Sequence, residues 1–250
     1  MELRELTSLA ELRACERAQC AVWGEPVPEV SIASFRAAQY AGALVAGAFE
    51  DDTLLGFAYS FPSVVEGRVG QHSHLLAVLP QERGRGVGRA LKWFQRGWCL
   101  SRGVTHISWT FDPLRAKNAK LNLEHLGASV KTYVTDFYGP LGGNLNGGLP
   151  SDRLIADWAL LDEAVAALAL ETSRPDAPKP TVARLLDQNG KPQLYDVTAE
   201  RVWLELPPEF PEPDALRWRL ALREAMLPLF ARGYRVARFV AGGYVMTKTH

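Results

Sequence analysis

The chain has 250 residues, of which 47% are hydrophobic and 22% are charged, and its 28 basic residues balance 28 acidic ones. This composition is typical of a globular protein with a large core, and it excludes a disordered chain. Because the formal net charge is zero, we expect neither a nucleic-acid-binding nor a membrane-binding surface, so any anion site must be local. The length allows one large domain or two small ones.

Cysteine usage and the amino-terminal sequence both favour a cytoplasmic protein. The chain has an odd number of cysteines, and they lack the spacing of metal ligands or of disulfide partners. They are Cys15, Cys20 and Cys99. We therefore expect small packed thiols and no metal site. The first residues carry no basic segment before an apolar run, and no stretch reaches the roughly 20 apolar residues of a membrane span.

Hydrophobic periodicity predicts alternating helices and strands up to residue 139. In chain order these are a helix over 9–24, two strands over 42–61 joined by a turn at Asp51 and Asp52, a strand over 72–80, a helix from Val87 to about Gly103, a strand over 104–111, a helix from Asp112 to Gly127 and a strand over 131–139. This order indicates a crossover sheet with helices packed against it.

The sequence after residue 139 predicts a smaller α+β part. Glycine-rich and proline-rich breaks at 139–150 and 171–180 flank a strand over 153–160, and the second break is a candidate linker. Beyond it we expect, in order, a hairpin around Asn189 and Gly190, a strand over 201–206, a helix over 214–232 with a core stripe, and a pair of strands over 234–249. The stripe of that helix comprises Trp218, Ala221, Leu222, Ala225 and Leu229.

One turn combines three glycines with three arginines in the sequence QERGRGVGRALKWF at residues 81–94. Backbone N–H groups in such a turn point into one concavity, and the helix N-terminus behind it carries about half a positive charge. Glycine there permits positive φ and close approach of a ligand. The turn is therefore a candidate anion site, and the alternative is a simple reversal of the chain. Glu82 is the one acidic residue among the basic residues Arg83, Arg85, Arg89, Lys92, Arg96 and Arg102.

The helix that follows the turn is amphipathic. Lys92 is expected outside its apolar face, which comprises Val87, Ala90, Leu91, Phe94 and Trp98. The spacing of the turn excludes two other phosphate motifs. A dinucleotide fingerprint requires a third glycine where Arg89 stands, and no P-loop sequence occurs.

The spacing R-x-x-G-x-G from Arg83 to Gly88, after a strand ending near Pro80, resembles the GNAT superfamily of N-acyltransferases. The resemblance implies an α/β (α+β) fold, a mixed sheet with splayed central strands flanked by helices, and a turn that binds the pyrophosphate of acetyl-CoA or succinyl-CoA. The donor-binding residues would be Val78, Leu79, Arg83, Gly84, Arg85, Gly86, Val87, Gly88, Arg89, Asn118 and Asn122.

The sequences TFDPLRAKNAKLNLEHLGA and WRLALREAMLPLFARGY resemble a branch of this superfamily with a carboxy-terminal extension, of which some members acylate amino acids. The implied organisation is a catalytic domain over 1–145, a loop, strand and linker over 146–180, and an α+β extension over 181–250. A homodimer is also implied. A CoA-binding regulator without catalytic activity is the alternative.

The resemblance further implies direct acyl transfer without a covalent enzyme intermediate. The pantetheine arm of the donor would lie beside residues 71–79 like an added strand. A backbone N–H near Val78 or Leu79 would then polarise the thioester carbonyl, as in an oxyanion hole. The cysteines are not needed as nucleophiles.

Two histidines and two tyrosines are the candidate acid–base residues. His72 and His74 share one strand parity with Leu76 and Val78, so we expect both imidazoles on the side of the oxyanion donor, with His74 preferred as general base. The alternative is a structural role at the strand. Leu123 stands where the family often places its acidic tyrosine.

Tyr133 or Tyr138 would replace that tyrosine as the acid, unless the CoA thiolate leaves without protonation or both tyrosines serve only in packing.

Several polar residues allow either binding or structural roles. Asn118 and Asn122 lie four residues apart and are expected on one helical face, as CoA ligands or as solvated surface. Asp112 is expected to form a turn or cap, with anchoring of the substrate amine as the alternative. Arginines of the last helix could bind an acidic acyl group such as succinyl. They are Arg217, Arg219 and Arg223.

Overall fold

The computed structural model describes residues 1–24, 26, 28–139, 148–170, 174, 182–183, 186, 199–207 and 209–248. They form two compact units, the first containing residues 1–109 and 159–162 and the second the described residues of 110–158 and 163–250. The hairpin expected around Asn189 and Gly190 lies outside the described residues, as does most of the expected linker. The domain boundaries at 145 and 180 stay a prediction.

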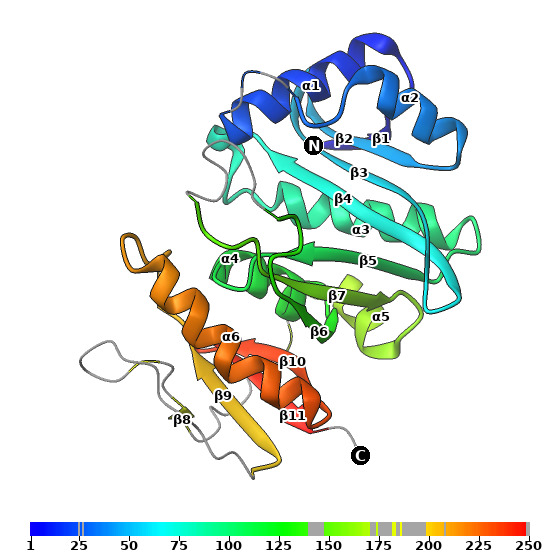
Figure 1. Cartoon of the computed structure of the whole chain (residues 1–250). Helices are drawn as coiled ribbons and strands as arrows, with labels where there is room; N and C mark the ends of the chain where they lie inside the picture. The colour runs from blue at the N-terminus through cyan, green and yellow to red at the C-terminus, as the bar shows by residue number, and fades with distance from the viewer. Residues whose placement is uncertain are drawn as a thin grey trace. The chain divides into compact units, whose positions relative to one another are not determined.

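The first unit contains a five-stranded sheet with helices on both faces (Figure 1). Its strands run in the order β1-β2-β3-β4-β5, antiparallel except for the parallel pair β4 and β5. The bounds are β1 Glu2–Glu5, α1 Leu9–Trp23, α2 Ile32–Tyr40, β2 Leu44–Glu50, β3 Thr53–Val65, β4 Arg68–Val78, η1 Pro80–Glu82, α3 Val87–Leu100 and β5 His106–Phe111. These elements confirm the helices and strands expected up to residue 111.

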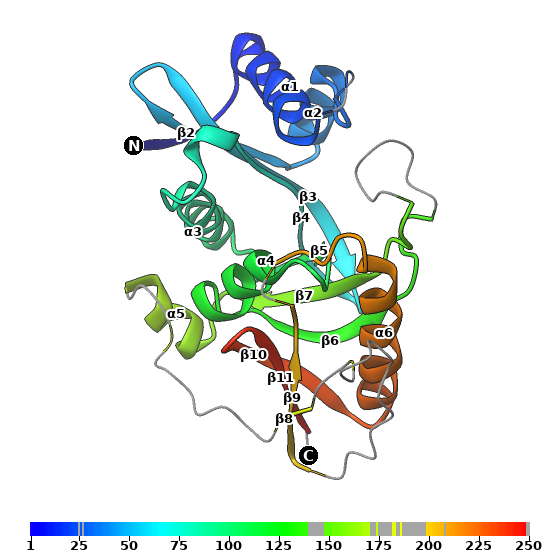
Figure 2. The ribbon, with the colours of Figure 1, turned by 90° about the vertical axis from the view of Figure 1, so that its left-hand side faces the viewer.

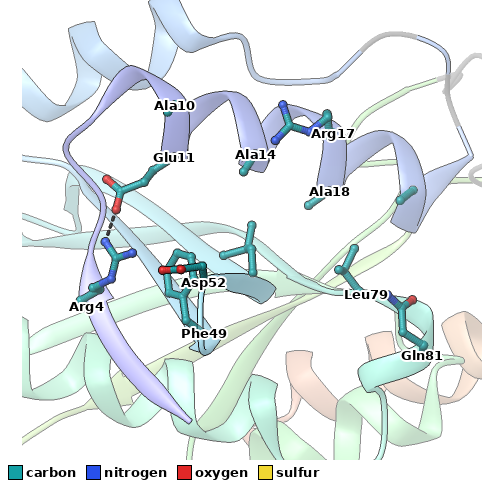
Figure 3. Close-up of a pocket in the computed structure, with 12 residues that line it drawn as sticks. Arg4, Ala10, Glu11, Ala14, Arg17, Ala18, Phe49, Asp52, Leu79 and Gln81 are labelled. Carbon is teal, nitrogen blue, oxygen red and sulfur yellow. Dashed lines mark hydrogen bonds and ion pairs between the residues drawn. The ribbon is translucent and has the colours of Figure 1, made fainter.

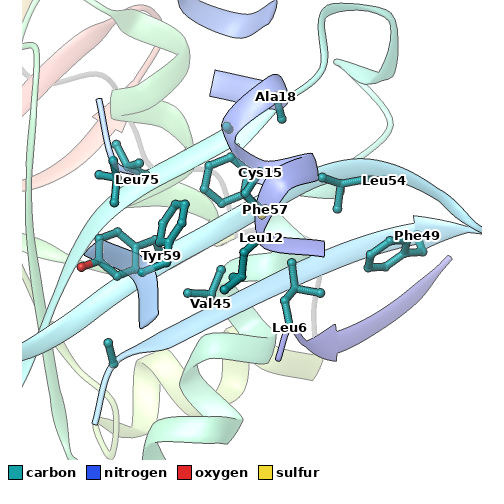
Figure 4. Packing of buried hydrophobic residues seen from close by; sticks show 14 residues of the cluster. Leu6, Leu12, Cys15, Ala18, Val45, Phe49, Leu54, Phe57, Tyr59 and Leu75 are labelled. Atoms are coloured by element: carbon teal, nitrogen blue, oxygen red, sulfur yellow. The ribbon is translucent and has the colours of Figure 1, made fainter. Parts of the chain in front are cut away.

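Two apolar clusters hold this sheet between its helices. On one face, α1 begins with a capping box at Ser8 and buries Leu12 and Cys15 against Phe57 of β3 (Figure 4). On the other face, Val87 and Leu91 of α3 pack against β2 and β3. Burial of apolar surface on both faces fixes the sheet as a rigid support for the turn between β4 and α3.

The second unit contains a sheet of six strands in the order β7-β6-β10-β11-β9-β8, with α6 packed on β6 and β10 (Figure 2). Strand β10 pairs antiparallel with β6 through Val236 and Val130, so the carboxy-terminal strands continue the sheet that β6 and β7 begin. The bounds are α4 Ala116–Lys120, η2 Leu121–His125, β6 Ser129–Val134, β7 Arg153–Ala159, α5 Glu163–Leu170, β8 Val182–Ala183, β9 Arg201–Glu205, α6 Ala215–Ala231, β10 Tyr234–Val240 and β11 Gly243–Lys248.

Two helices differ from the sequence prediction. The segment expected as one regular helix up to Gly127 is the short α4 followed by a π-helical turn, η2. The wider π-helical turn rotates the residues that follow it relative to a regular α-helix, so Asn118 is exposed whereas Asn122 is buried. The prediction that the two asparagines lie on one helical face is wrong. In α6, Arg219 and Met226 are buried with Ala221, Leu222 and Leu229, while Trp218 and Ala225 are only partly buried. Of the helices described, none has the length and apolar character of a membrane span.

Candidate active site

The turn between η1 and α3 has the backbone of an anion cradle. Gly84 and Gly86 adopt the left-handed region, with φ of 84° and 80°, and a Cβ on either would meet no atom within 4 Å. Gly86 caps α3 without any side-chain hydrogen bond, and the first intrahelical bond runs from Ala90 N to Gly86 O. The helix therefore begins without a side-chain acceptor for its first N–H groups, which is the arrangement that binds anions.

Gly88 has a different role from the other two glycines. It has ordinary helical backbone and lies in the first turn of α3, where an added Cβ would stand 3.5 Å from Val78 Cγ2 and 3.6 Å from Leu76 Cδ2. Gly88 does not use the positive φ that glycine permits. Its lack of a side chain instead allows α3 to pack closely on the end of β4.

The basic residues around the turn are not equivalent. Arg83 is exposed, whereas Arg85 forms ion pairs with Glu50 at 2.8 Å and with Glu82. Lys92 is 2% exposed, so its expected place outside the core is wrong. Its Nζ donates to Ser73 Oγ and Gln95 Oε1 and lies 3.9 Å from the centre of the Trp109 ring. Burial lowers the pKa of Lys92 to about 7.

Strands β4 and β5 pair only where they begin. Parallel pairing joins Gln71 to Ile107 and His72 to Ser108, and the described residues contain no further pair between these strands. The end of β4 therefore has a free edge on this side, as expected for splayed central strands. An edge of this kind can accept an extended ligand by main-chain hydrogen bonds.

Backbone directions distinguish the two amides expected to face a thioester. Leu79 N donates to Leu55 O at 3.0 Å, so the Leu79 N–H is used within the sheet. Residues along an antiparallel strand alternate between pairs that exchange hydrogen bonds and pairs that do not. Gly56 and Val78, the next pair in the register, therefore direct their N–H groups away from each other, and Val78 N–H points to the splayed side. The same alternation directs the N–H of Leu76 there, which the sequence prediction missed.

A β-bulge at His74 changes the side on which the histidines lie. Ser60 pairs with Ser73 and Tyr59 pairs with Leu75, so His74 is the extra residue of β4. His72 and His74 lie beside Phe61, with ring centroids 5.3 and 5.6 Å away, on the face covered by α1 and α2. Leu76 and Val78 pack with α3 on the opposite face, so the expected common side of all four residues is wrong.

The two histidines have different electrostatic surroundings. His74 Nε2 lies 3.2 Å from Oε1 of Glu29, which precedes α2, and this contact lowers the pKa of Glu29. His72 is more deeply enclosed, and burial, together with the charges of His74 and Lys92, lowers its pKa to about 4. The low pKa makes His72 a poor proton acceptor near neutral pH, whereas His74 is the imidazole that contacts a carboxylate. Glu29 is a partner that the sequence prediction missed.

The comparisons with known proteins agree with this geometry. Residues 7–127 match the sequence model of the acetyltransferase (GNAT) family. These residues form a GNAT domain. The fold, with its splayed parallel strands and the glycine turn before α3, was predicted from the sequence and is confirmed. No curated protein sequence matches the chain significantly.

Solved structures with the same fold match this chain over most of their own length. The ribosomal-protein-S18-alanine N-acetyltransferase from Escherichia coli is 21% identical, with a TM-score of 0.51, over 64% of this chain and 93% of its own. The yncA protein from Salmonella typhimurium, solved with its cofactor acetyl-CoA, is 19% identical, with a TM-score of 0.51, over 71% and 99%. An aminoglycoside 6'-acetyltransferase type Ii is 16% identical, with a TM-score of 0.50, over 65% and 99%.

The two candidate tyrosines lie just beyond the GNAT domain and differ in exposure. Tyr133 is buried and donates to Asp152, and burial, with that carboxylate, raises its pKa far above the ordinary value. Tyr138 is 40% exposed, and its hydroxyl lies 2.9 Å from Thr110 Oγ1. Tyr138 is therefore the accessible hydroxyl of the two. Leu123 is fully buried in the π-helical turn of the GNAT domain.

The other polar candidates have partners within the second unit. Asp112 accepts from Leu114 N at 2.8 Å, which confirms the expected turn, and it also pairs with Arg219. Arg223 pairs with Asp152, and Arg217 pairs with Asp214. The hypothesis that these arginines bind an acyl carboxylate is therefore wrong for Arg219 and Arg223, because aspartates already neutralise them. Among the described residues, no group of three potential metal ligands occurs.

Proposed function

We propose that this chain is an N-acyltransferase that moves an acetyl or succinyl group from acyl-CoA to a primary amine, and that the acceptor is the amino group of an amino acid. The observation that carries the proposal is the glycine turn before α3, where no side chain accepts from the first N–H groups of the helix. This turn directly follows a strand whose last amides face an open edge. We also propose a homodimer, on the resemblance alone, and a cytoplasmic location, on the cysteine usage.

The turn fits the diphosphate of a CoA thioester. Gly84 and Gly86 leave open space where other residues would carry a Cβ, and the N-terminus of α3 supplies N–H donors and a partial positive charge. The exposed Arg83 adds charge, and the exposed Asn118 is suited to the pantetheine amides. Asn122 is buried, so we assign it a structural role instead.

Acyl transfer would proceed by direct attack on the thioester. The amine nitrogen bonds to the carbonyl carbon while the Val78 N–H stabilises the developing oxyanion, and the C–S bond then breaks. One such donor is worth roughly 3 to 4 kcal/mol. The coenzyme leaves as a thiolate whose conjugate acid has a pKa of about 8.5, which is a tolerable leaving group near neutral pH.

His74 would take the proton from the attacking amine, directly or through water. A free amine must be neutral to attack, and an α-amine with a pKa near 8 is neutral in roughly one molecule in ten at pH 7. Glu29 would hold the imidazole and stabilise its charged form, as their 3.2 Å contact indicates. Tyr138 is our candidate for protonation of the leaving thiolate, since its hydroxyl is accessible whereas that of Tyr133 is not.

A CoA-binding regulator without catalytic activity is the second candidate. The buried Leu123, at the place where the family often carries its acidic tyrosine, favours it. Thiol release from acetyl-CoA and succinyl-CoA separates the two candidates. We would assay amino acids, peptides and aminoglycosides, because solved structures of the same fold include a ribosomal-protein-S18-alanine N-acetyltransferase and an aminoglycoside 6'-acetyltransferase. Amine-dependent thiol release supports the enzyme, while CoA binding in calorimetry without release supports the regulator.

A further inference from the structure

Five charged side chains of the second unit meet where β5 ends, where β7 begins and along one side of α6. We call them the arginine–aspartate cluster: Asp112, Asp152, Arg153, Arg219 and Arg223. Three guanidinium groups face two carboxylates, so the cluster carries one excess positive charge. Because buried charges are normally paired, this excess requires an explanation.

Both carboxylates of the cluster are already engaged. Arg219 donates from Nη1 and Nη2 to the two oxygens of Asp112, at 2.7 and 2.8 Å. Asp152 is fully buried and accepts from Arg223, from the Tyr133 hydroxyl and from Asp136 N. Burial raises the pKa of Asp152, but the hydrogen bonds from Arg223 and Tyr133 outweigh burial and hold that pKa below its ordinary value.

Arg153 is the guanidinium that forms an ion pair with neither carboxylate. It is half-buried at the start of β7, donates to the backbone oxygen of Asp152 at 2.9 Å, and lies 5.1 Å from the centre of the Tyr138 ring. Among the described residues, no carboxylate lies within ion-pair distance of it. Burial lowers the pKa of Arg153, as expected for a charge with incomplete compensation.

Asp136 is a further acidic residue that contacts the cluster, through its backbone N–H and the Asp152 carboxylate. It is exposed, and its carboxylate accepts from the backbone N and the hydroxyl of Ser151. An exposed carboxylate is screened by water and salt, so it does not cancel the charge of a half-buried guanidinium.

The Arg153 guanidinium lies over the ring of Tyr138, whose hydroxyl is hydrogen-bonded to that of Thr110. Tyr138 Oη and Thr110 Oγ1 are 2.9 Å apart, and Tyr138 is exposed to solvent. A guanidinium offers parallel N–H donors that match a carboxylate, and a hydroxyl adds a further donor. The charge of the group, its partial exposure and its polar neighbours together suit a small anion.

We propose that Arg153, which lies over the ring of Tyr138, binds the carboxylate of a small-molecule substrate. The site would select amines or acyl groups that carry a carboxylate over neutral analogues. Its use in acyl transfer rests on the proposed function, whereas the binding of a carboxylate does not.

Calorimetry with succinate, succinamide and inorganic phosphate as probes tests the site without any CoA. We expect the full chain to bind succinate at least about tenfold more tightly than the neutral succinamide, since a charge-assisted pair is lost in the latter. Equal affinity for the two probes would overturn the proposal without any variant. Tighter binding of phosphate than of succinate would overturn the assignment to a carboxylate.

Variants locate the site. Arg153→Gln should weaken succinate binding about tenfold or more, and Arg153→Lys should restore part of it because the charge remains but the paired donors do not. Arg235→Gln, at an exposed arginine of β10, is the matched control and should bind as the unaltered chain does. Unchanged binding by Arg153→Gln, with its circular dichroism intact, would refute the assignment. If acyl transfer is absent while carboxylate binding follows this pattern, only the proposed function fails.

Discussion

At the scale of single residues, Lys92 is a buried lysine whose pKa is lowered by its surroundings. Its amine bridges Ser73 of β4 and Gln95 of α3 and lies over Trp109 of β5, entirely within the first unit. The sequence predicts Lys92 on the polar face of α3, because a lysine is rarely buried. Its contacts with Ser73, Gln95 and Trp109 make the burial tolerable.

Lys92 should make the stability of the protein depend on pH. The folded pKa is about 7, below the unfolded value of 10.5, so the unfolded chain binds more protons between these values. Stability contributed by this group should therefore rise as pH increases from about 7 towards 10, by on the order of a few kcal/mol over the full window. Urea unfolding of the intact chain at several pH values measures this slope.

Lys92→Met should flatten that part of the pH profile, because methionine does not titrate. The exposed Lys131→Met is the control and should keep the slope of the unaltered chain. A slope that is the same in all three proteins would show that Lys92 keeps an ordinary pKa.

The histidines of β4 should differ in their effects on catalysis. His74→Gln should lower kcat/KM by about 10²-fold or more while leaving the affinity for acyl-CoA unchanged, because a general base acts on the acceptor amine. His72 has a pKa of about 4, so it stays neutral from pH 6 to 8 and should contribute no step to the activity profile there. Steady-state kinetics over this range check both statements. An equal loss of donor affinity in His74→Gln would point to a structural role.

At the scale of elements, Gly56 determines how closely β4 and α3 approach β3. A Cβ at this position would stand 2.5 Å from Ala77 O and 3.3 Å from Val87 Cγ1. Gly56→Ala should therefore displace the end of β4, lower the free energy of unfolding by about 1 to 3 kcal/mol and weaken CoA binding. Chemical denaturation and calorimetry measure the two effects.

Gly97 of α3 offers a matched substitution. A Cβ there meets no atom within 4 Å, so Gly97→Ala should stabilise the helix by roughly 0.5 to 1 kcal/mol and leave CoA binding unchanged. If both alanine variants behave alike, the close approach at Gly56 is not what positions the turn.

Most elements follow from local patterns in the sequence. The spacing around Gly86 predicted the turn and α3, and Asp51 and Asp52 predicted the β2–β3 turn, because these signals are local. The bulge at His74 and the π-helical turn at Leu121–His125 depend on register against neighbouring elements. No residue type announces either feature, so the sides of His72 and Asn122 were predicted wrongly.

At the scale of the whole molecule, ion pairs join segments that are far apart in the chain. Asp112 and Arg219 are separated by 107 positions, and Arg219 is fully buried. The family match ends at residue 127, so α6 supplies the partner of an aspartate that lies within the GNAT domain. The turn chemistry of Asp112 was predictable from Pro113, but this distant partner was not.

Arg219→Met should lower the free energy of unfolding by about 3 to 5 kcal/mol, because it leaves the Asp112 carboxylate without its cation. The double variant Asp112→Asn with Arg219→Met should recover much of this loss. Arg217→Met, in an exposed pair with Asp214, should cost less than about 1 kcal/mol. Equal losses for Arg217→Met and Arg219→Met in urea unfolding would contradict this account.

The central claim is that main-chain amides from Gly84 to Gly88, with that of Val78, hold an acyl-CoA. Titration of ¹⁵N-labelled full-length protein with acetyl-CoA, followed by amide chemical shifts, tests it most directly. We predict that the largest shifts occur at these amides, and that CoA without its acyl group reproduces them in the turn but less fully at Val78. Saturating acetyl-CoA that leaves these amide signals in place would contradict the account.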